Sequence, residues 1–133
     1  MPNKFSKEEL IVEEWLKKAR DDELIAQSIL KHRDAPPSGA CFASQQMAEK
    51  YFKAFLVDKQ NRFPRIHILE HLLALCTKID SSFEGLKKEV TFLDGFYTPV
   101  RYPGDYPEFS WKDAEEAFEK ALKIKDFVLT KIK

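Results

Sequence analysis

The stretch SGACFASQQMAEKYFKAFLVDKQ, residues 38–60, decides the fold class of this chain of 133 residues. Most of its residues are good helix formers, and Pro37 separates it from the segment before it. Four of its apolar residues fall on one stripe at helical spacing: Cys41, Ala48, Phe52 and Phe55. The stretch therefore predicts a long helix that buries one face.

The same pattern continues on both sides of this segment. Between the prolines and glycines lie segments rich in Leu, Ala, Lys and Glu, whose apolar residues also recur at helical spacing. They predict helices over residues 6–32, 66–79, 82–97 and 110–131, and no stretch shows the alternation of a strand. We therefore predict a single all-α domain over residues 1–133, an antiparallel up-and-down bundle of four long helices plus one shorter helix.

The composition excludes several classes of protein. With 22 basic and 22 acidic side chains the net charge is zero, which argues against binding of nucleic acid by bulk electrostatics. There is no long apolar run and no signal-peptide pattern, so we expect a soluble cytoplasmic protein without membrane contact. Cys41 and Cys76 are too few for a disulfide framework and lack metal-ligand spacing. We expect neither a metal nor a cofactor.

Polar residues interrupt the apolar pattern of the segment 38–60. Gln45 and Glu49 are four residues apart, and a second row lies beside them: Gln46, Lys50 and Lys53. One interpretation is a solvated helix face with weak ion pairs, and the other is a polar seam facing a cleft or a second subunit. The helix alone favours the solvated face.

Asp22 falls on the apolar stripe of the first predicted helix. A carboxylate there is costly unless it is paired or hydrogen-bonded, so a cationic partner such as Lys50 or Arg101 is expected. An ion pair or cap and a functional acid are both compatible with this position.

The segment His67-Ile68-Leu69-Glu70-His71 matches the His-x-x-Glu-His zinc-protease pattern in its letters. Such enzymes need a further protein ligand downstream and a larger chain around the substrate. We interpret His67 and His71 as a half-exposed pair on one helix face.

The loop TPVRYPGDYP, residues 98–107, is the best candidate for function. Arg101 offers a planar set of donors suited to phosphate or carboxylate, and Tyr102 and Tyr106 offer rings for stacking on bases. Prolines on both sides restrict the backbone of the loop. The alternative is that Arg101 pairs with Asp22 or Glu49 and only ties the loop to the bundle.

Taken together, these motifs resemble the HEPN family of small helical domains. Residues 45–54 resemble its Gln-Gln-x-x-Glu-Lys-x-x-Lys-Ala helix, and residues 15–26 resemble its Trp-x-x-x-Ala-x-x-Asp-x-x-x-Ala opening. His67 stands where the family has Thr-His-Asp-Leu, and residues 101–103 resemble its Arg-Tyr-Pro turn. The resemblance covers about residues 10–130 and implies a homodimeric bundle, often the partner of a minimal nucleotidyltransferase in a toxin–antitoxin-like pair.

Some branches of the family are metal-independent ribonucleases with an Arg-x4–6-His motif at the last helix. Here no histidine follows His71, so the motif histidine is absent. A ribonuclease using Arg101 would have only Asp105 or Tyr106 for proton transfer, which suit that role poorly.

Three hypotheses follow from the resemblance and this departure. The first, which we favour, is a dimeric module without strong catalysis that binds nucleotide, RNA or a nucleotidyltransferase partner through Lys50, Lys53, Arg101 and Tyr102, with Asp22, Gln45 and Glu49 as structural polar residues. The second is a metal-independent endoribonuclease, and the third is a purely structural assembly protein.

Overall fold

The computed structural model describes residues 5–97 and 108–132 of the chain, and within them every regular element is helical. The elements are η1 (Glu8–Leu10), α1 (Val12–His32), α2 (Pro37–Gln60), α3 (Leu69–Ile79), η2 (Ser81–Leu86), α4 (Lys87–Asp94) and α5 (Trp111–Lys131). The predicted all-α class is confirmed. Among the described residues, no helix has the length and hydropathy needed to cross a bilayer.

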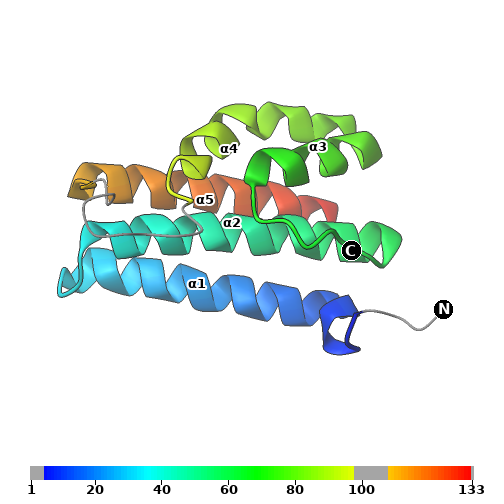
Figure 1. Ribbon diagram of the computed structural model, residues 1–133, viewed down its shortest axis with the longest axis horizontal. Helices are drawn as coiled ribbons and strands as arrows, with labels where there is room; N and C mark the ends of the chain where they lie inside the picture. Colours follow the sequence, from blue (N-terminus) through cyan, green and yellow to red (C-terminus); the bar gives the residue numbers. More distant parts are fainter. Residues whose placement is uncertain (1–4, 98–107, 133) are drawn as a thin grey trace.

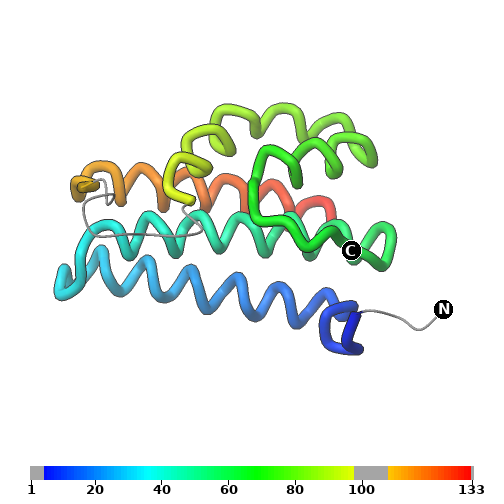
Figure 2. Tube along the Cα trace, in the orientation of Figure 1, coloured from blue at the N-terminus to red at the C-terminus, as the bar shows by residue number. Residues whose placement is uncertain are grey.

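The three long helices α1, α2 and α5 lie side by side, and the short pair α3 and α4 packs along one flank of this layer (Figure 1). The trace in Figure 2 shows that the chain after α2 runs back along that helix before α3 begins. As a result α3 runs in the same direction as α2, which departs from a strict up-and-down order. Residues 61–68, the α2–α3 linker, therefore lie against the middle of the molecule and not at its end.

The central helix α2 is buried along nearly its whole length, which explains its high content of alanine and aromatic residues. Fully buried alanines from three helices allow close packing of the backbones: Ala19, Ala26, Ala40, Ala48, Ala114, Ala117 and Ala121. The flank facing α3 and α4 is filled by phenylalanine. Phe83 of η2 contacts Phe55 with ring centroids 4.4 Å apart and Phe127 at 4.9 Å.

The first and fourth predicted helices are shorter than expected. Ser6 and Glu9 do exchange the two hydrogen bonds of a capping box, at 2.8 and 3.2 Å, but one 3₁₀ turn follows and the chain extends at Ile11 before α1. Likewise the segment predicted over 82–97 is a 3₁₀ turn followed by the eight residues of α4. The spacing of apolar residues did not reveal either break, because 3₁₀ turns and α-helix bury similar positions over one turn.

The start of α3 is fixed by a side chain from another helix. The Asp94 carboxylate, at the end of α4, accepts the backbone N–H groups of Leu69 at 2.8 Å and Glu70 at 2.9 Å. These are two of the donors that a helix N-terminus leaves free, and a carboxylate there also complements the helix dipole. The helix consequently begins at Leu69, and His67 lies before it in the linker.

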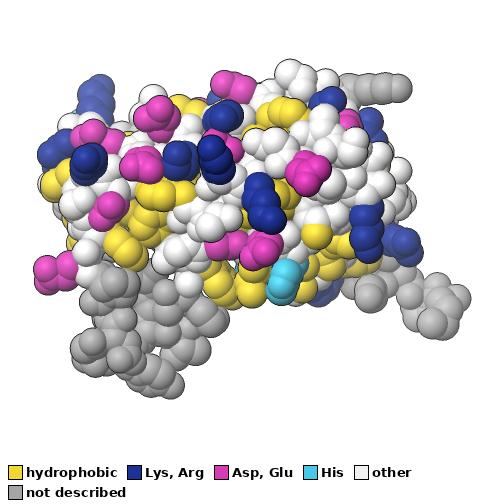
Figure 3. Space-filling model, turned by 90° about the horizontal axis from the view of Figure 1, so that it is seen from above, with side chains coloured by type: hydrophobic (Ala, Val, Ile, Leu, Met, Phe, Trp, Pro, Cys, Tyr) yellow, Lys and Arg dark blue, Asp and Glu magenta, His cyan; other side chains and the backbone are white. Residues whose placement is uncertain are grey.

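Charged side chains of both signs alternate over the face formed by α3 and α4 (Figure 3). This mixing is the spatial counterpart of the balanced composition. It gives that face no broad field of one sign.

Candidate functional site

The polar residues of α2 are enclosed within the chain. Gln45 is fully buried, and Glu49 and Lys53 are only 4% and 3% exposed. The prediction that these residues lie on a solvated helix face is therefore wrong for all three of them. Since buried polar groups are costly unless they are hydrogen-bonded, each should have a defined partner.

Lys50 provides the cationic partner expected for Asp22. Its ammonium group donates to the Asp22 carboxylate, joining α2 to α1. Burial raises the pKa of Asp22 above its ordinary value, and the hydrogen bond from Lys50 opposes that rise. Both side chains keep some exposure, 22% for Lys50 and 14% for Asp22, so the pair sits at the edge of the interior.

Lys53 and His67 converge on one oxygen of Glu49. The Lys53 ammonium lies 2.9 Å from Glu49 Oε2, and His67 Nδ1 lies 3.1 Å from the same atom. The Lys53 ammonium also lies 5.7 Å from the ring centre of Trp15 and 5.6 Å from that of Phe63. Lys53 is thus held inside the bundle and is not part of a surface that could contact a ligand.

A second set of contacts fixes the backbone of the linker. Gln45 Nε2 donates to the carbonyl of His67 at 3.1 Å, while Gln45 Oε1 accepts from Gln46 at 2.7 Å. The His67 ring stacks on Tyr97, with centroids 6.1 Å apart and planes at 24°. The backbone and the ring of His67 are therefore held from α2 and from the residue that precedes the loop 98–107.

His67 nevertheless faces outward. Of its side-chain surface 53% is exposed, although Nδ1 reaches the buried Glu49. His67 and His71 are not a pair on one helix face, because α3 begins after His67. The two histidines of the zinc-protease pattern therefore do not lie on one helix. In the described part of the chain, no group of three or more His, Cys, Asp or Glu side chains could hold a metal ion.

A cleft of about 490 Å³ opens next to Lys50, between η1, the start of α1 and α2. Its lining residues are Glu8, Glu9, Glu14, Trp15, Lys17, Lys18 and Lys50. Glu9 is occupied by Arg65, 2.8 Å away, and hydrogen bonding by that arginine lowers the pKa of Glu9 to about 2. Lys17 and Lys18 are exposed and have no ion-pair partner among the described residues. The cleft thus combines an indole ring with three ammonium groups and three carboxylates, so an anionic ligand with an aromatic part would bind on its lysine side.

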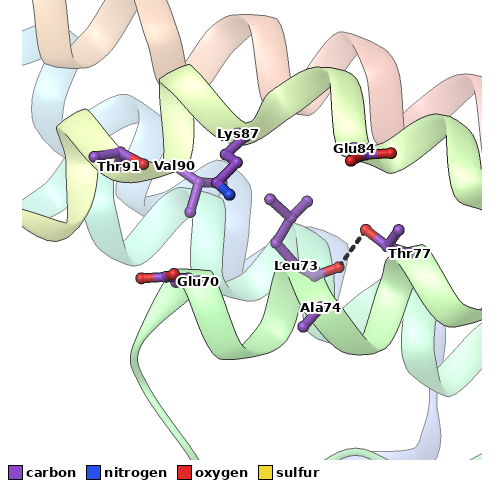
Figure 4. A pocket seen from close by; sticks show the side chains of 8 residues that line it. All are labelled: Glu70, Leu73, Ala74, Thr77, Glu84, Lys87, Val90 and Thr91. Carbon is purple, nitrogen blue, oxygen red and sulfur yellow. Dashed lines mark hydrogen bonds between the residues drawn. The ribbon is translucent and has the colours of Figure 1, made fainter.

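A smaller hollow of about 330 Å³ separates α3 from η2 and α4 (Figure 4). Its floor is aliphatic, with Leu73 and Val90, and charged residues such as Glu84 and Lys87 stand at its edge. Thr77 is engaged within α3, donating to the Leu73 carbonyl at 2.7 Å. No buried polar group among its lining residues lacks a partner, and the hollow is a weaker candidate for a binding site.

The loop residues Arg101, Tyr102, Asp105 and Tyr106 lie outside the described residues, and their sequence-based roles stay predictions. Sequence reasoning did not identify Trp15 and Tyr97 as parts of a site. No signal in the sequence could have identified them, because their contacts with Lys53 and His67 join distant parts of the chain.

Two comparisons with known proteins identify the same family for this chain. The family model of the HEPN domain matches residues 12–132. The crystal structure of ST0689, an archaeal HEPN homologue, is similar over 92% of this chain and 98% of that one, with 34% sequence identity and a TM-score of 0.73. No curated protein matches the chain. On the fold, the motifs and these matches, the chain belongs to the HEPN domain family.

Proposed function

We propose that this protein is a dimeric HEPN module that binds the phosphate and base of a nucleotide or of single-stranded RNA in the cleft beside Lys50. The observation that carries the proposal is the composition of that cleft. Lys17 and Lys18 line it together with Trp15 and Lys50, and Lys50 is paired with Asp22.

The lining holds as many glutamates as lysines, so an anion would bind at the lysine side of the cleft and not throughout it. Lys50 is already paired with Asp22, so the two exposed lysines on α1 carry the available charge. Ammonium groups contact phosphates as point charges, and aromatic rings accept any base by stacking. A site of this kind binds with little sequence preference and with affinity that falls as salt rises.

Arg101 and Tyr102, which lie outside the described residues, remain sequence-based candidates for contacts to phosphate and base. Their planar donors and ring suit phosphate and base, as the sequence indicated. The family resemblance also supports a minimal nucleotidyltransferase as a protein partner. A nucleotidyltransferase acts on nucleotides, which are the class of ligand proposed for the cleft.

Dimerisation is supported by apolar side chains that the single chain leaves exposed. Leu24 and Ile25 on α1 are 55% and 49% exposed, and Phe42 on α2 is 40% exposed. A second copy of the chain would bury such residues. Light scattering after size exclusion tests this part: a dimer mass is expected, and a monomer mass at high protein concentration would contradict it.

Fluorescence anisotropy of a labelled single-stranded RNA of about ten nucleotides tests the binding proposal. We expect Lys18→Glu to weaken binding about tenfold, because it replaces attraction with repulsion at the cleft. Lys88→Glu on the exposed face of α4 is the matched control, with the same charge change away from the cleft. Equal affinity of both variants and the wild type, or equal loss in both, would refute the placement of the ligand.

A further inference from the structure

The cleft beside Lys50 receives two of its three carboxylates from one short element. Glu8 and Glu9 belong to η1, whereas Glu14 and the lysines belong to α1 and α2. We call residues 5–10 the N-terminal strap. A phosphate at the lysines would have the carboxylates of the strap nearby, and like charges repel. In its present position the strap should therefore lower the affinity of the cleft for an anion.

The N-terminal strap is a separate element and not the first turn of α1. The chain is extended at Ile11, with φ −105° and ψ 115°, and α1 begins after it at Val12 (Figure 1). None of the residues of η1 is buried. Hinges are formed by a few residues at the ends of elements that absorb changes in φ and ψ. The strap can therefore move about Ile11 without unwinding α1.

The strap is anchored by aromatic, ionic and hydrogen-bond contacts. The Phe5 ring lies on the Phe63 ring, with centroids 4.7 Å apart. Glu9 Oε2 lies 2.8 Å from Nη1 of Arg65, and the backbone carbonyl of Glu9 accepts the indole N–H of Trp15 at 2.7 Å. The ion pair is partly solvated, since the two side chains are 28% and 55% exposed, and such pairs contribute little stability. The anchors thus hold the strap weakly enough for a ligand to displace it.

Displacement of the strap would change the cleft in two ways that both favour RNA. It would remove the carboxylates of Glu8 and Glu9 from the lining. It would also uncover the side of Phe63 on which Phe5 lies. Phe63 is 4% exposed and lies edge-on to Trp15, with ring centroids 4.8 Å apart. A second ring beside the indole would offer another surface on which a base can stack.

We infer that the N-terminal strap is an autoinhibitory wall of the cleft, closed in the free protein and displaced about Ile11 when single-stranded RNA binds. The inference rests on the proposed function, because RNA is a ligand proposed for this cleft. The open form is then the one that binds, and the apparent affinity is reduced in proportion to the fraction of molecules that are open. A change that weakens an anchor and leaves the lysines intact should therefore raise the affinity.

Phe5 separates this inference from plain electrostatics. It carries no charge and does not line the cleft. If the strap were only a structural end of the bundle, Phe5→Ala would leave the affinity for RNA unchanged or lower it through a loss of stability. An autoinhibitory strap predicts the opposite direction, a gain in affinity.

The test is fluorescence anisotropy of the full chain with a labelled single-stranded RNA of about ten nucleotides. Phe5→Ala should bind about three- to tenfold more tightly than the wild type, because an aromatic pair no longer holds the strap closed. Phe92→Ala is the matched control. It removes a ring on α4, 5.3 Å from that of Phe96 and away from the cleft, and should bind like the wild type. Thermal melting checks that each variant is folded.

Glu9→Gln weakens a second anchor and keeps the size of the side chain. The hydrogen bond from Arg65 lowers the pKa of Glu9 to about 2, so the wild-type carboxylate is charged at the neutral pH of the assay. This variant should also bind RNA more tightly. Glu13→Gln makes the same change of charge at an exposed position of α1 outside the lining, and it should alter the affinity less than Glu9→Gln does.

NMR spectroscopy follows the strap itself. The nuclear Overhauser effect between the rings of Phe5 and Phe63 should be present in the free wild type and disappear when RNA saturates the protein. The indole N–H of Trp15, which donates to the Glu9 carbonyl in the closed form, should exchange with solvent faster in free Phe5→Ala than in the free wild type.

The outcomes separate the two proposals. Tighter binding by Phe5→Ala and by Glu9→Gln, with loss of the ring contact in the complex, establishes the strap as a displaced wall. If the wild type binds RNA and either variant binds no more tightly, or if the ring contact persists in the saturated complex, the inference is overturned and the proposed function stands. If none of these proteins binds RNA, the proposed function is overturned and the inference falls with it.

Discussion

Replacing Lys53 by methionine tests the interior arrangement on which the site depends. Methionine keeps most of the volume and the apolar contact with Trp15 and Phe63, but it removes the cation 2.9 Å from Glu49. Glu49 is 4% exposed, and its Oε1 has no hydrogen-bond partner among the described residues. In the variant, His67 would therefore be the one hydrogen-bond partner left to the Glu49 carboxylate in the described part of the chain. Removing one member of a buried pair costs about 3–5 kcal/mol, because the other charge stays buried.

A loss of that size lowers the melting temperature of a domain of this length by about 10–20 °C. Circular dichroism during thermal unfolding measures the shift. The double variant Lys53→Met with Glu49→Gln should recover a large part of the loss, since the stranded charge is gone. Lys59→Met, near the exposed end of α2, is the control and should change stability by less than about 1 kcal/mol. A Lys53→Met protein within about 1 kcal/mol of the wild type would refute the reasoning that this pair is enclosed and coupled.

Three further predictions concern stability. Phe83→Ala should cost about 3–5 kcal/mol in urea unfolding because it empties the space among Phe52, Phe55 and Phe127; a loss below about 1 kcal/mol would contradict the packing. Asp94→Ala should destabilise by about 1–2 kcal/mol through loss of the two bonds to α3, and hydrogen exchange should speed up at Leu69 and Glu70; unchanged exchange there would argue against the cap. The pKa of Glu9 is lowered from 4.5 to about 2 by Arg65, so its contribution to stability is complete above pH 4.5 and should be lost progressively as the pH falls towards 2. Glu9→Gln should flatten this part of the stability profile, and an unchanged profile would contradict the assignment.

The fold class followed from the sequence because its signals are local. Helical spacing and breaks at proline and glycine located the five helices. A carboxylate on an apolar stripe predicted a cationic partner for Asp22, and the structure identifies Lys50 and not Arg101 as that partner. The direction of α3 did not follow, because the return of residues 61–68 along α2 depends on contacts between distant parts of the chain.

The candidate site was only partly predictable for the same reason. The polar residues of α2 were recognised as unusual, yet periodicity could not tell a solvated face from one covered by the linker. The bond between Glu49 and His67 joins residues 18 apart, and the stacking of His67 on Tyr97 joins residues still further apart. No spacing rule within one helix predicts such contacts.

The tautomer of His67 tests most directly the central claim that the buried Glu49 accepts hydrogen bonds from both Lys53 and His67. A long-range ¹H–¹⁵N correlation spectrum separates the two ring nitrogens of each of the three histidines and shows which nitrogen carries the proton. We predict that His67 carries its proton on Nδ1, because that nitrogen donates to Glu49 Oε2. A His67 ring with its proton on Nε2 would contradict the account.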